Sequence, residues 1–260
     1  MLLANKVAIV TGIGPGLGRD IALLFAREGA DLAIAARNVE RLSAVAREVE
    51  ALGRSVLAIP TDITDRAACQ ALVSKAQERF GRVDVLVQNG HYDGDYKIVD
   101  QSDPQDWRDI MEVNLFGALH LVQAVAPGMR ARGEGRIILV NSGASTDPPP
   151  TLGAYAASKA ALASLVRTIA VELGPDGIRA NGIQLGPMDG ENFRGYLEDL
   201  ARTAGRSYEE ELAAYNEQFA LRYTPTTEEC AGTALFLASD LARPITGQSI
   251  AVNGGKWFLT

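Results

Sequence analysis

The chain alternates short apolar runs with longer amphipathic segments along most of its length. Seven runs rich in Val, Ile, Leu and Ala lie at residues 7–11, 32–35, 56–59, 83–87, 136–140, 178–185 and 248–252. Continuous apolar runs indicate strands covered on both faces, and the helix-length segments between them imply right-handed crossovers. The pattern predicts an α/β fold: a doubly wound parallel sheet of about seven strands with helices on both faces. A single domain spans residues 1–260.

One connection, residues 186–227, is much longer than the others. Its length of about 40 residues exceeds ordinary connections between elements and is typical of functional loops. Apolar residues recur at helical spacing in two parts of it, at Phe193, Tyr196, Leu197 and Leu200 and then at Leu212, Tyr215 and Phe219. We expect two helices here that act as a lid over a largely apolar substrate pocket.

Charge and composition narrow the possible partners. The chain has 32 acidic and 25 basic residues, for a formal net charge of -7, which disfavours nucleic acids and anionic membranes. It has two cysteines, Cys69 and Cys230, and two histidines, too few for a disulfide framework or a metal centre. We therefore expect a cytoplasmic protein with no metal, no nucleic-acid partner and no membrane span.

A glycine-rich turn follows the first apolar run. It contains Gly12, Gly14, Gly16 and Gly18, with Leu17 among them, and an amphipathic helical pattern continues from it. Glycines at such a turn let backbone N–H groups approach a diphosphate, which the positive end of the following helix also favours. The sequence therefore predicts nucleotide binding at this turn.

A second motif places a phenol and an ammonium group on one helical face. Tyr155 and Lys159 are four residues apart, which is about one turn of helix. A nearby ammonium favours the phenolate and is expected to lower the pKa of Tyr155 from its usual value near 10. Such a tyrosine can exchange a proton with a substrate oxygen.

These motifs together resemble the classical short-chain dehydrogenase/reductase family, over essentially the whole chain. The residues that carry the resemblance are the TGxxxGxG spacing from Thr11, the segment Thr61-Asp62-Ile63, the YxxxK pair at 155–159 and Asn253-Gly254-Gly255. The resemblance implies a Rossmann fold, a nicotinamide dinucleotide cofactor and a catalytic tetrad. That tetrad is Asn114, Ser142, Tyr155 and Lys159.

The resemblance also assigns a role to each of these positions. Ser142 would orient the substrate oxygen near Tyr155, Lys159 would bind the ribose, and Asn114 would hold a water linked to the lysine. The implied cofactor-binding residues are Gly12, Gly14, Gly16, Leu17, Gly18, Arg37, Asp62, Ile63, Asn89, Gly90, Tyr155, Lys159 and Met188.

The end of the second apolar run bears on which dinucleotide binds. NAD-binding proteins place a carboxylate there on the ribose hydroxyls. This chain has Ala35, Ala36 and Arg37 instead, and Asp31 is at the opposite end of the run. Arg37 resembles the basic residue that holds the 2′-phosphate in NADP-preferring members, a role suited to a guanidinium. The sequence therefore favours NADP(H) as the cofactor. NAD(H) stays possible, because the alternative interpretation of Arg37 is that it begins a solvent-exposed helix, beside Arg41.

Several positions depart from the family pattern, and Asn89 is the one residue of the NNAG segment that is retained. His91 replaces the usual glycine after Asn89 and Gly90, Leu185 replaces a proline, and Gly190 replaces a threonine. The threonine hydroxyl normally supplies a cofactor hydrogen bond, which Gly190 cannot make. The backbone of Met188 would still bind the carboxamide of the cofactor, because that contact does not require a particular side chain.

The function expected from these features is oxidation or reduction at a CH–OH group. A nicotinamide cofactor would interconvert a secondary alcohol and a ketone on a neutral, fairly hydrophobic small molecule. The alternative is a catalytically silent dinucleotide-sensing protein, which would not need the tetrad. Helices expected at 110–126 and 154–173 are apolar on several sides, which predicts a homotetramer or homodimer.

Overall fold

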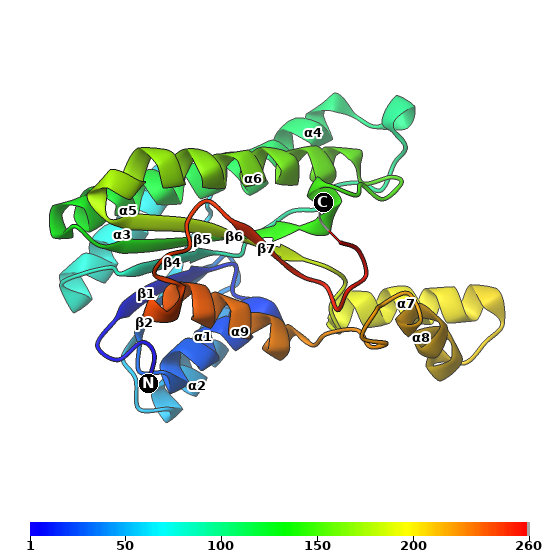
Figure 1. Ribbon diagram of the computed structural model, residues 1–260, viewed down its shortest axis with the longest axis horizontal. Coiled ribbons are helices and arrows are strands. Elements are labelled where there is room, and N and C mark those ends of the chain that lie inside the picture. The colour runs from blue at the N-terminus through cyan, green and yellow to red at the C-terminus, as the bar shows by residue number, and fades with distance from the viewer. Residues whose placement is uncertain (259–260) are drawn as a thin grey trace.

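The computed structural model describes residues 1–258 and contains one parallel sheet (Figure 1). Its strand order is β3-β2-β1-β4-β5-β6-β7. The strands are β1 (Val7–Thr11), β2 (Asp31–Ala36), β3 (Val56–Pro60), β4 (Val85–Gln88), β5 (Gly135–Ser142), β6 (Ile178–Leu185) and β7 (Ser249–Val252). The predicted doubly wound α/β fold with about seven strands is confirmed.

Helices cover both faces of the sheet in two layers (Figure 1). They are α1 (Leu17–Arg27), α2 (Val39–Ala51), α3 (Arg66–Phe80), α4 (Pro104–Met111), α5 (Gly117–Arg132), α6 (Gly153–Leu173), α7 (Glu191–Ala204), α8 (Tyr208–Asn216) and α9 (Thr227–Ala238). One layer is α1, α2 and α9, and the other is α3 to α6. Successive strand residues point to opposite faces, so Val10 packs under the first layer and Ile9 under the second.

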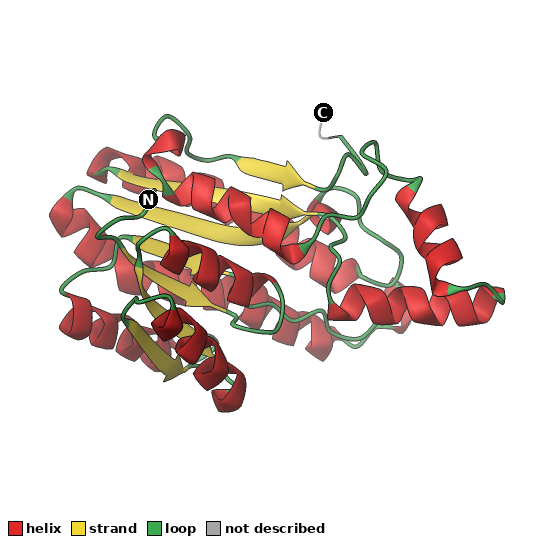
Figure 2. Cartoon of the chain, turned by 90° about the horizontal axis from the view of Figure 1, so that it is seen from below, coloured by secondary structure: helices red, strands yellow, loops and turns green. Residues whose placement is uncertain are grey.

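The position of β1 determines where the functional cavity lies. β1 lies between β2 and β4, so the chain winds outward in opposite directions from this point. In open α/β sheets, ligands bind at such a reversal, beyond the carboxyl ends of the strands. In Figure 2 the strand arrows point toward the side on which α7 and α8 lie. The glycine turn and the long connection therefore share that edge.

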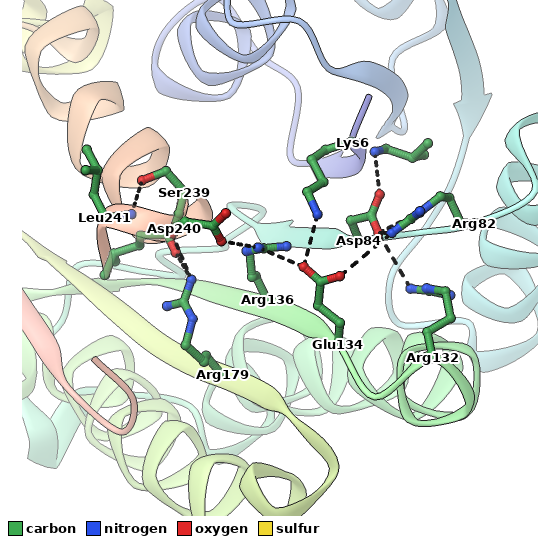
Figure 3. A network of polar contacts seen from close by, with 12 residues as sticks. Lys6, Arg82, Asp84, Arg132, Glu134, Arg136, Arg179, Ser239, Asp240 and Leu241 are labelled. Atoms are coloured by element: carbon green, nitrogen blue, oxygen red, sulfur yellow. Dashed lines mark hydrogen bonds and ion pairs between the residues drawn. The ribbon is translucent and has the colours of Figure 1, made fainter. Parts of the chain in front are cut away.

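A network of charged side chains connects the amino ends of the strands, at the opposite edge (Figure 3). The carboxylate of Asp84 is fully buried, accepts a hydrogen bond from the backbone N–H of Val7 at 2.9 Å, and pairs with Arg82. Arg136 bridges Glu134 at 2.9 Å and Asp240 at 2.7 Å. A buried carboxylate needs such partners, and the network ties β1, β4 and β5 together far from the cavity.

The long connection contains two helices, α7 and α8, as its apolar spacing predicts. They project from the body of the domain in Figure 1. Helix α8 starts with a capping box between Ser207 and Glu210 and ends at Asn216, before the expected helical residue Phe219. Phe219 is instead buried in the following turn, 1% exposed, and its ring lies 5.8 Å from that of Tyr215.

The segment Pro104–Arg132 is continuous, and a π-helical turn (Glu112–Phe116) joins α4 to α5. It is long and apolar enough to cross a membrane by length and composition. Leu121, Val125 and Met129 of α5 are fully buried against the sheet layer. The apolar character of this segment is therefore explained by its place in the core.

Candidate active site

Two adjoining cavities open at the carboxyl edge of the sheet. The Tyr155 cavity, of about 590 Å³, includes Ser142, Tyr155 and Lys159 in its wall. The Arg37 cavity, of about 420 Å³, includes Arg37 and Asp62. The two cavities share five wall residues: Gly12, Gly14, Arg41, Asn89 and His91.

Three members of the predicted tetrad meet in the Tyr155 cavity. Ser142 is the last residue of β5, whereas the sequence places it just beyond that strand. Tyr155 and Lys159 lie one turn apart on α6, with the Lys159 Nζ 5.5 Å from the centre of the Tyr155 ring. Lys159 Nζ donates to the carbonyl of Val140 at 3.0 Å. Strand β5 therefore supplies both the serine and the carbonyl that fixes the lysine.

The pKa of Tyr155 shifts opposite to the expected direction. Burial of the phenol is the main cause and raises its pKa, the Asp93 carboxylate raises it further, and a hydrogen bond with Ser142 lowers it. Burial also lowers the pKa of Lys159 to about 8, against a smaller rise from Asp93. Desolvation disfavours both charged forms, so it outweighs the ammonium effect expected from spacing alone. Tyr155 thus holds its proton at neutral pH.

Asn114 does not line either cavity. It lies in the π-helical turn, and its side chain is 1% exposed. Its Oδ1 accepts from the backbone N–H of Tyr92 at 2.9 Å, while its Nδ2 donates to the Tyr92 carbonyl and the Ser158 hydroxyl. The amide therefore joins the loop after β4 to α6, directly behind Tyr155. The water-holding role implied by the family resemblance stays a prediction.

The glycine turn packs closely against the loop after β4. A Cβ on Gly12 would lie 2.3 Å from the backbone nitrogen of Gly90, and one on Gly18 would lie 2.3 Å from the Gly12 carbonyl. Gly12 also has φ +70°, which disfavours other residues. Asn89 Nδ2 donates to the Gly12 carbonyl at 2.9 Å and fixes the turn. The turn residues Gly12, Gly14, Gly16, Leu17 and Gly18 all line the Tyr155 cavity.

The Arg37 cavity contains the expected adenosine-side residues. Arg37, Asp62, Ile63 and Gly90 line it. The backbone N–H and hydroxyl of Thr64 hold the pKa of Asp62 below its usual value, with a smaller contribution from the Arg37 guanidinium. Asp31 pairs with Arg54 at 2.8 Å at the other end of β2. The wall that contains Arg37 thus has no carboxylate from β2.

His91 lies where the two cavities join, and Asp93 lies behind it. His91 Nε2 is 3.6 Å from the Asp93 carboxylate, and the His91 and Tyr155 rings meet edge to face at 6.5 Å. Desolvation and the nearby ammonium of Lys159 lower the pKa of His91, while Asp93 raises it less. The sequence analysis identified His91 but not Asp93. A single carboxylate in an acidic loop has the sequence pattern of an ordinary solvent-exposed residue.

The lid side of the Tyr155 cavity is less apolar than expected. Met188 and Phe193 line it, as do the departing residues Leu185 and Gly190. Glu191 and Asn192 also line it. Four of the expected apolar residues do not: Tyr196, Leu197, Tyr215 and Phe219. Leu197 and Phe219 are buried. Phe219 packs beside Gly254 of the C-terminal turn, and its ring centre lies 5.3 Å from the Lys256 Nζ.

The indole of Trp257 packs against the segment after Ser142. A Cβ on Gly143 would lie 1.7 Å from the Trp257 ring, and one on Gly186 would lie 3.3 Å from it. Asn253 Nδ2 donates to the Trp257 carbonyl at 2.9 Å and holds this turn. Glycine at 143 is thus required for the ring to pack there, a relation across more than a hundred residues that local sequence pattern does not carry.

Comparison with known proteins agrees with this geometry. Residues 6–201 match the family model described as short chain dehydrogenase. The 7alpha-hydroxysteroid dehydrogenase of Escherichia coli (strain K12) is 35% identical over 258 residues, covering 97% of this chain and 94% of that protein. L-sorbose reductase from Gluconobacter frateurii, solved with NADPH and L-sorbose, is 31% identical with a TM-score of 0.92 and 98% coverage of both chains.

A second solved structure, NAD⁺-bound xylitol dehydrogenase, is 28% identical with a TM-score of 0.89, covering 98% of this chain and 100% of that one. The two solved structures share this fold, and their names describe a dehydrogenase and a reductase; one was solved with NAD⁺ and the other with NADPH. The chain belongs to the short-chain dehydrogenase family.

Proposed function

We propose that this protein is an NADP(H)-preferring oxidoreductase that interconverts a secondary alcohol and a ketone on a neutral small molecule. The observation that carries the proposal is the meeting of Ser142, Tyr155 and Lys159 in one cavity that adjoins the glycine turn. A dinucleotide-binding protein without chemistry needs the turn, but it does not need a proton donor and an orienting hydroxyl beside it.

The bound nicotinamide would supply or accept the hydride, and this chain would manage the proton and the substrate oxygen. The Ser142 hydroxyl orients that oxygen near the phenol, which donates its proton during ketone reduction. Lys159, fixed by the Val140 carbonyl, places a positive charge beside Tyr155 and holds the ribose. The glycine turn and the N-terminus of α1 would hold the diphosphate.

Activity in the reducing direction should decrease as the pH rises through about 8. Tyr155, with its raised pKa, stays protonated over this range. Lys159, with a pKa of about 8, loses the positive charge that the proposed mechanism places beside Tyr155 and at the ribose. We therefore expect kcat/KM for ketone reduction to be flat from about pH 6 to 7 and to fall above pH 8. An initial-rate profile over pH 6–10 measures this, and a rate that rises through pH 8 would contradict it.

The cavity wall favours a neutral substrate with an apolar side. Leu185, Met188 and Phe193 provide apolar surface, whereas Glu191 disfavours anionic groups. Asn192 on the same wall can bind a substrate hydroxyl. The relatives solved with L-sorbose or named for xylitol act on hydroxyl-rich compounds, so polyols belong in any screen beside hydrophobic alcohols.

A substrate screen tests the proposed function directly. Hydrophobic secondary alcohols and polyols are offered with NADP⁺ and NAD⁺, and the matching ketones with NADPH and NADH, while the nicotinamide absorbance is followed. We expect turnover with at least one neutral alcohol–ketone pair and faster turnover with NADP(H). Tight dinucleotide binding without turnover on any pair would favour the silent sensing protein instead.

The segment 186–227 is proposed to close over bound ligands. It projects from the domain, and it contributes Met188 and Phe193 to the cavity wall. Its backbone amides should exchange hydrogen faster in the free protein than with cofactor and substrate bound. Hydrogen-exchange mass spectrometry compares the two states, with helix α3, whose residues line neither cavity, as internal control. Equal protection of the segment in both states would argue against a lid.

We also propose that the protein forms a homodimer or homotetramer through the layer that contains α5 and α6. Apolar side chains remain exposed there, including Val171 at 76% and Phe116 at 41%. Exposed apolar surface of this kind favours association with a second copy, and sedimentation equilibrium measures the resulting mass.

A further inference from the structure

Five residues line both cavities and mark the boundary between them, which we call the waist. It consists of Gly12, Gly14, Arg41, Asn89 and His91. The catalytic groups lie on one side of the waist, and the Arg37 and Asp62 side chains lie on the other. A dinucleotide that reaches both cavities must pass through the waist.

The part of the ligand at the waist is its middle, which carries the diphosphate. Gly12 and Gly14 belong to the turn before α1, and the start of that helix, at Gly16, Leu17 and Gly18, lines the Tyr155 cavity beside Arg41. Backbone N–H groups and the helix dipole at such a start attract anions. A Cβ on Gly14 would meet no atom within 4 Å, so the turn is open on this side. The two nucleosides then extend into the two cavities.

Arg41 is the cationic side chain at the waist. It lies in the first turn of α2, where Asn38 Oδ1 accepts from its backbone N–H at 2.9 Å. This cap holds the start of the helix at the carboxyl edge of the sheet. Within residues 1–258 the Arg41 guanidinium has no ion-pair partner, unlike that of Arg19, which pairs with Asp20 and Glu48. Its donors are therefore available to an oxyanion.

The other side chains at the waist do not supply this charge. The lowered pKa of His91 keeps its imidazole neutral at pH 7. One N–H of the Asn89 amide donates to the Gly12 carbonyl. Arg41 is thus the charged side chain among the five residues of the waist.

We propose that Arg41 binds the diphosphate of the dinucleotide and so contributes to the affinity for NAD(H) and NADP(H) alike. This inference rests on the proposed function, since it requires a dinucleotide in the two cavities. It assigns different roles to the two arginines of this region: Arg37 binds the 2′-phosphate of NADP(H), and Arg41 binds the diphosphate, which both cofactors contain.

Binding measurements on two variants test this assignment without activity. We expect Arg41→Gln to weaken NAD⁺ and NADP⁺ by the same factor of about tenfold, the loss typical of one charge-assisted contact. Adenosine 2′-monophosphate, which has no diphosphate, should bind the variant as it binds the wild type. Arg37→Ala should weaken NADP⁺ and adenosine 2′-monophosphate and leave NAD⁺ unchanged. Isothermal titration calorimetry gives each dissociation constant.

Arg47→Gln is the matched control, because Arg47 is an exposed arginine on α2 that lines neither cavity. It should bind every ligand as the wild type does. Selective loss of NADP⁺ in Arg41→Gln would place Arg41 at the 2′-phosphate and overturn the inference, and so would unchanged binding of both dinucleotides. A wild-type protein that binds neither dinucleotide would overturn the proposed function as well.

Discussion

Replacing Tyr155 with phenylalanine should lower kcat by about 10²- to 10⁴-fold, the usual contribution of a general acid or base. The ring of Tyr155 lies between Lys159 and His91, at 5.5 Å from the Lys159 Nζ and 6.5 Å from the His91 ring. Phenylalanine keeps that packing and removes only the proton donor. Cofactor affinity should therefore change little, and steady-state rates together with titrations of NADPH separate the two effects.

Tyr223→Phe is a suitable control for this experiment. The Tyr223 hydroxyl contacts Glu229 at 3.4 Å near the start of α9, and the residue lines neither cavity. Its kcat should equal that of the wild type. If Tyr155→Phe retained more than half of the wild-type kcat, Tyr155 would not be the proton donor.

Replacing Arg37 with alanine should weaken NADP(H) by roughly ten- to a hundredfold and leave NAD(H) nearly unchanged. Arg37 is exposed at the wall of its cavity and has no ion-pair partner within residues 1–258. Hydrogen bonds to charged groups contribute about 1.5 to 3 kcal/mol, and about 1.4 kcal/mol corresponds to tenfold in affinity. Only NADP(H) carries the 2′-phosphate that this guanidinium would bind.

Ala36→Asp extends the same prediction. A carboxylate there would repel the 2′-phosphate and accept from the ribose hydroxyls, so the preference should move further toward NAD(H). Dissociation constants for both cofactors are compared in wild type, Arg37→Ala and Ala36→Asp. A wild type that already binds NAD(H) more tightly, or an Arg37→Ala variant that weakens both cofactors equally, would refute the NADP(H) preference.

The sheet was predictable because buried parallel strands leave a continuous apolar signature. Each of the seven runs corresponds to a strand; the boundaries of β1 and β6 are identical to those of their runs, and the others differ by one or two residues. The strand after Arg82 begins at Val85, although the backbone N–H of Asp84 already donates to the Val7 carbonyl and its carbonyl accepts from the Arg136 N–H. The strand ending at Ser142 runs two residues beyond the apolar run because Asn141 and Ser142 still pair with β6.

The candidate site was predictable where residues lie close in sequence or follow a strand, and less so elsewhere. Spacing brings Tyr155 and Lys159 together, but it does not reveal how strongly burial opposes their charged forms. The π-helical turn at Asn114 has no periodicity of its own to detect. The place of Arg41 beside the cavities was predictable from the sequence, because Arg41 lies one helical turn after Arg37 at the same edge of the sheet. Asp93 and Trp257 act through tertiary packing, which the sequence pattern does not contain.

The residues that line the two cavities are synthesised at different times. Every residue that lines the Arg37 cavity lies at or before Val113, whereas the Tyr155 cavity needs residues as far as Thr227 and the Trp257 ring behind Gly143. Chains emerge and fold from the amino terminus, so the surface for a nucleotide has all its residues when less than half of the chain exists. The Tyr155 cavity gains Thr227, the last of its lining residues, only after that, and the Trp257 ring behind Gly143 later still.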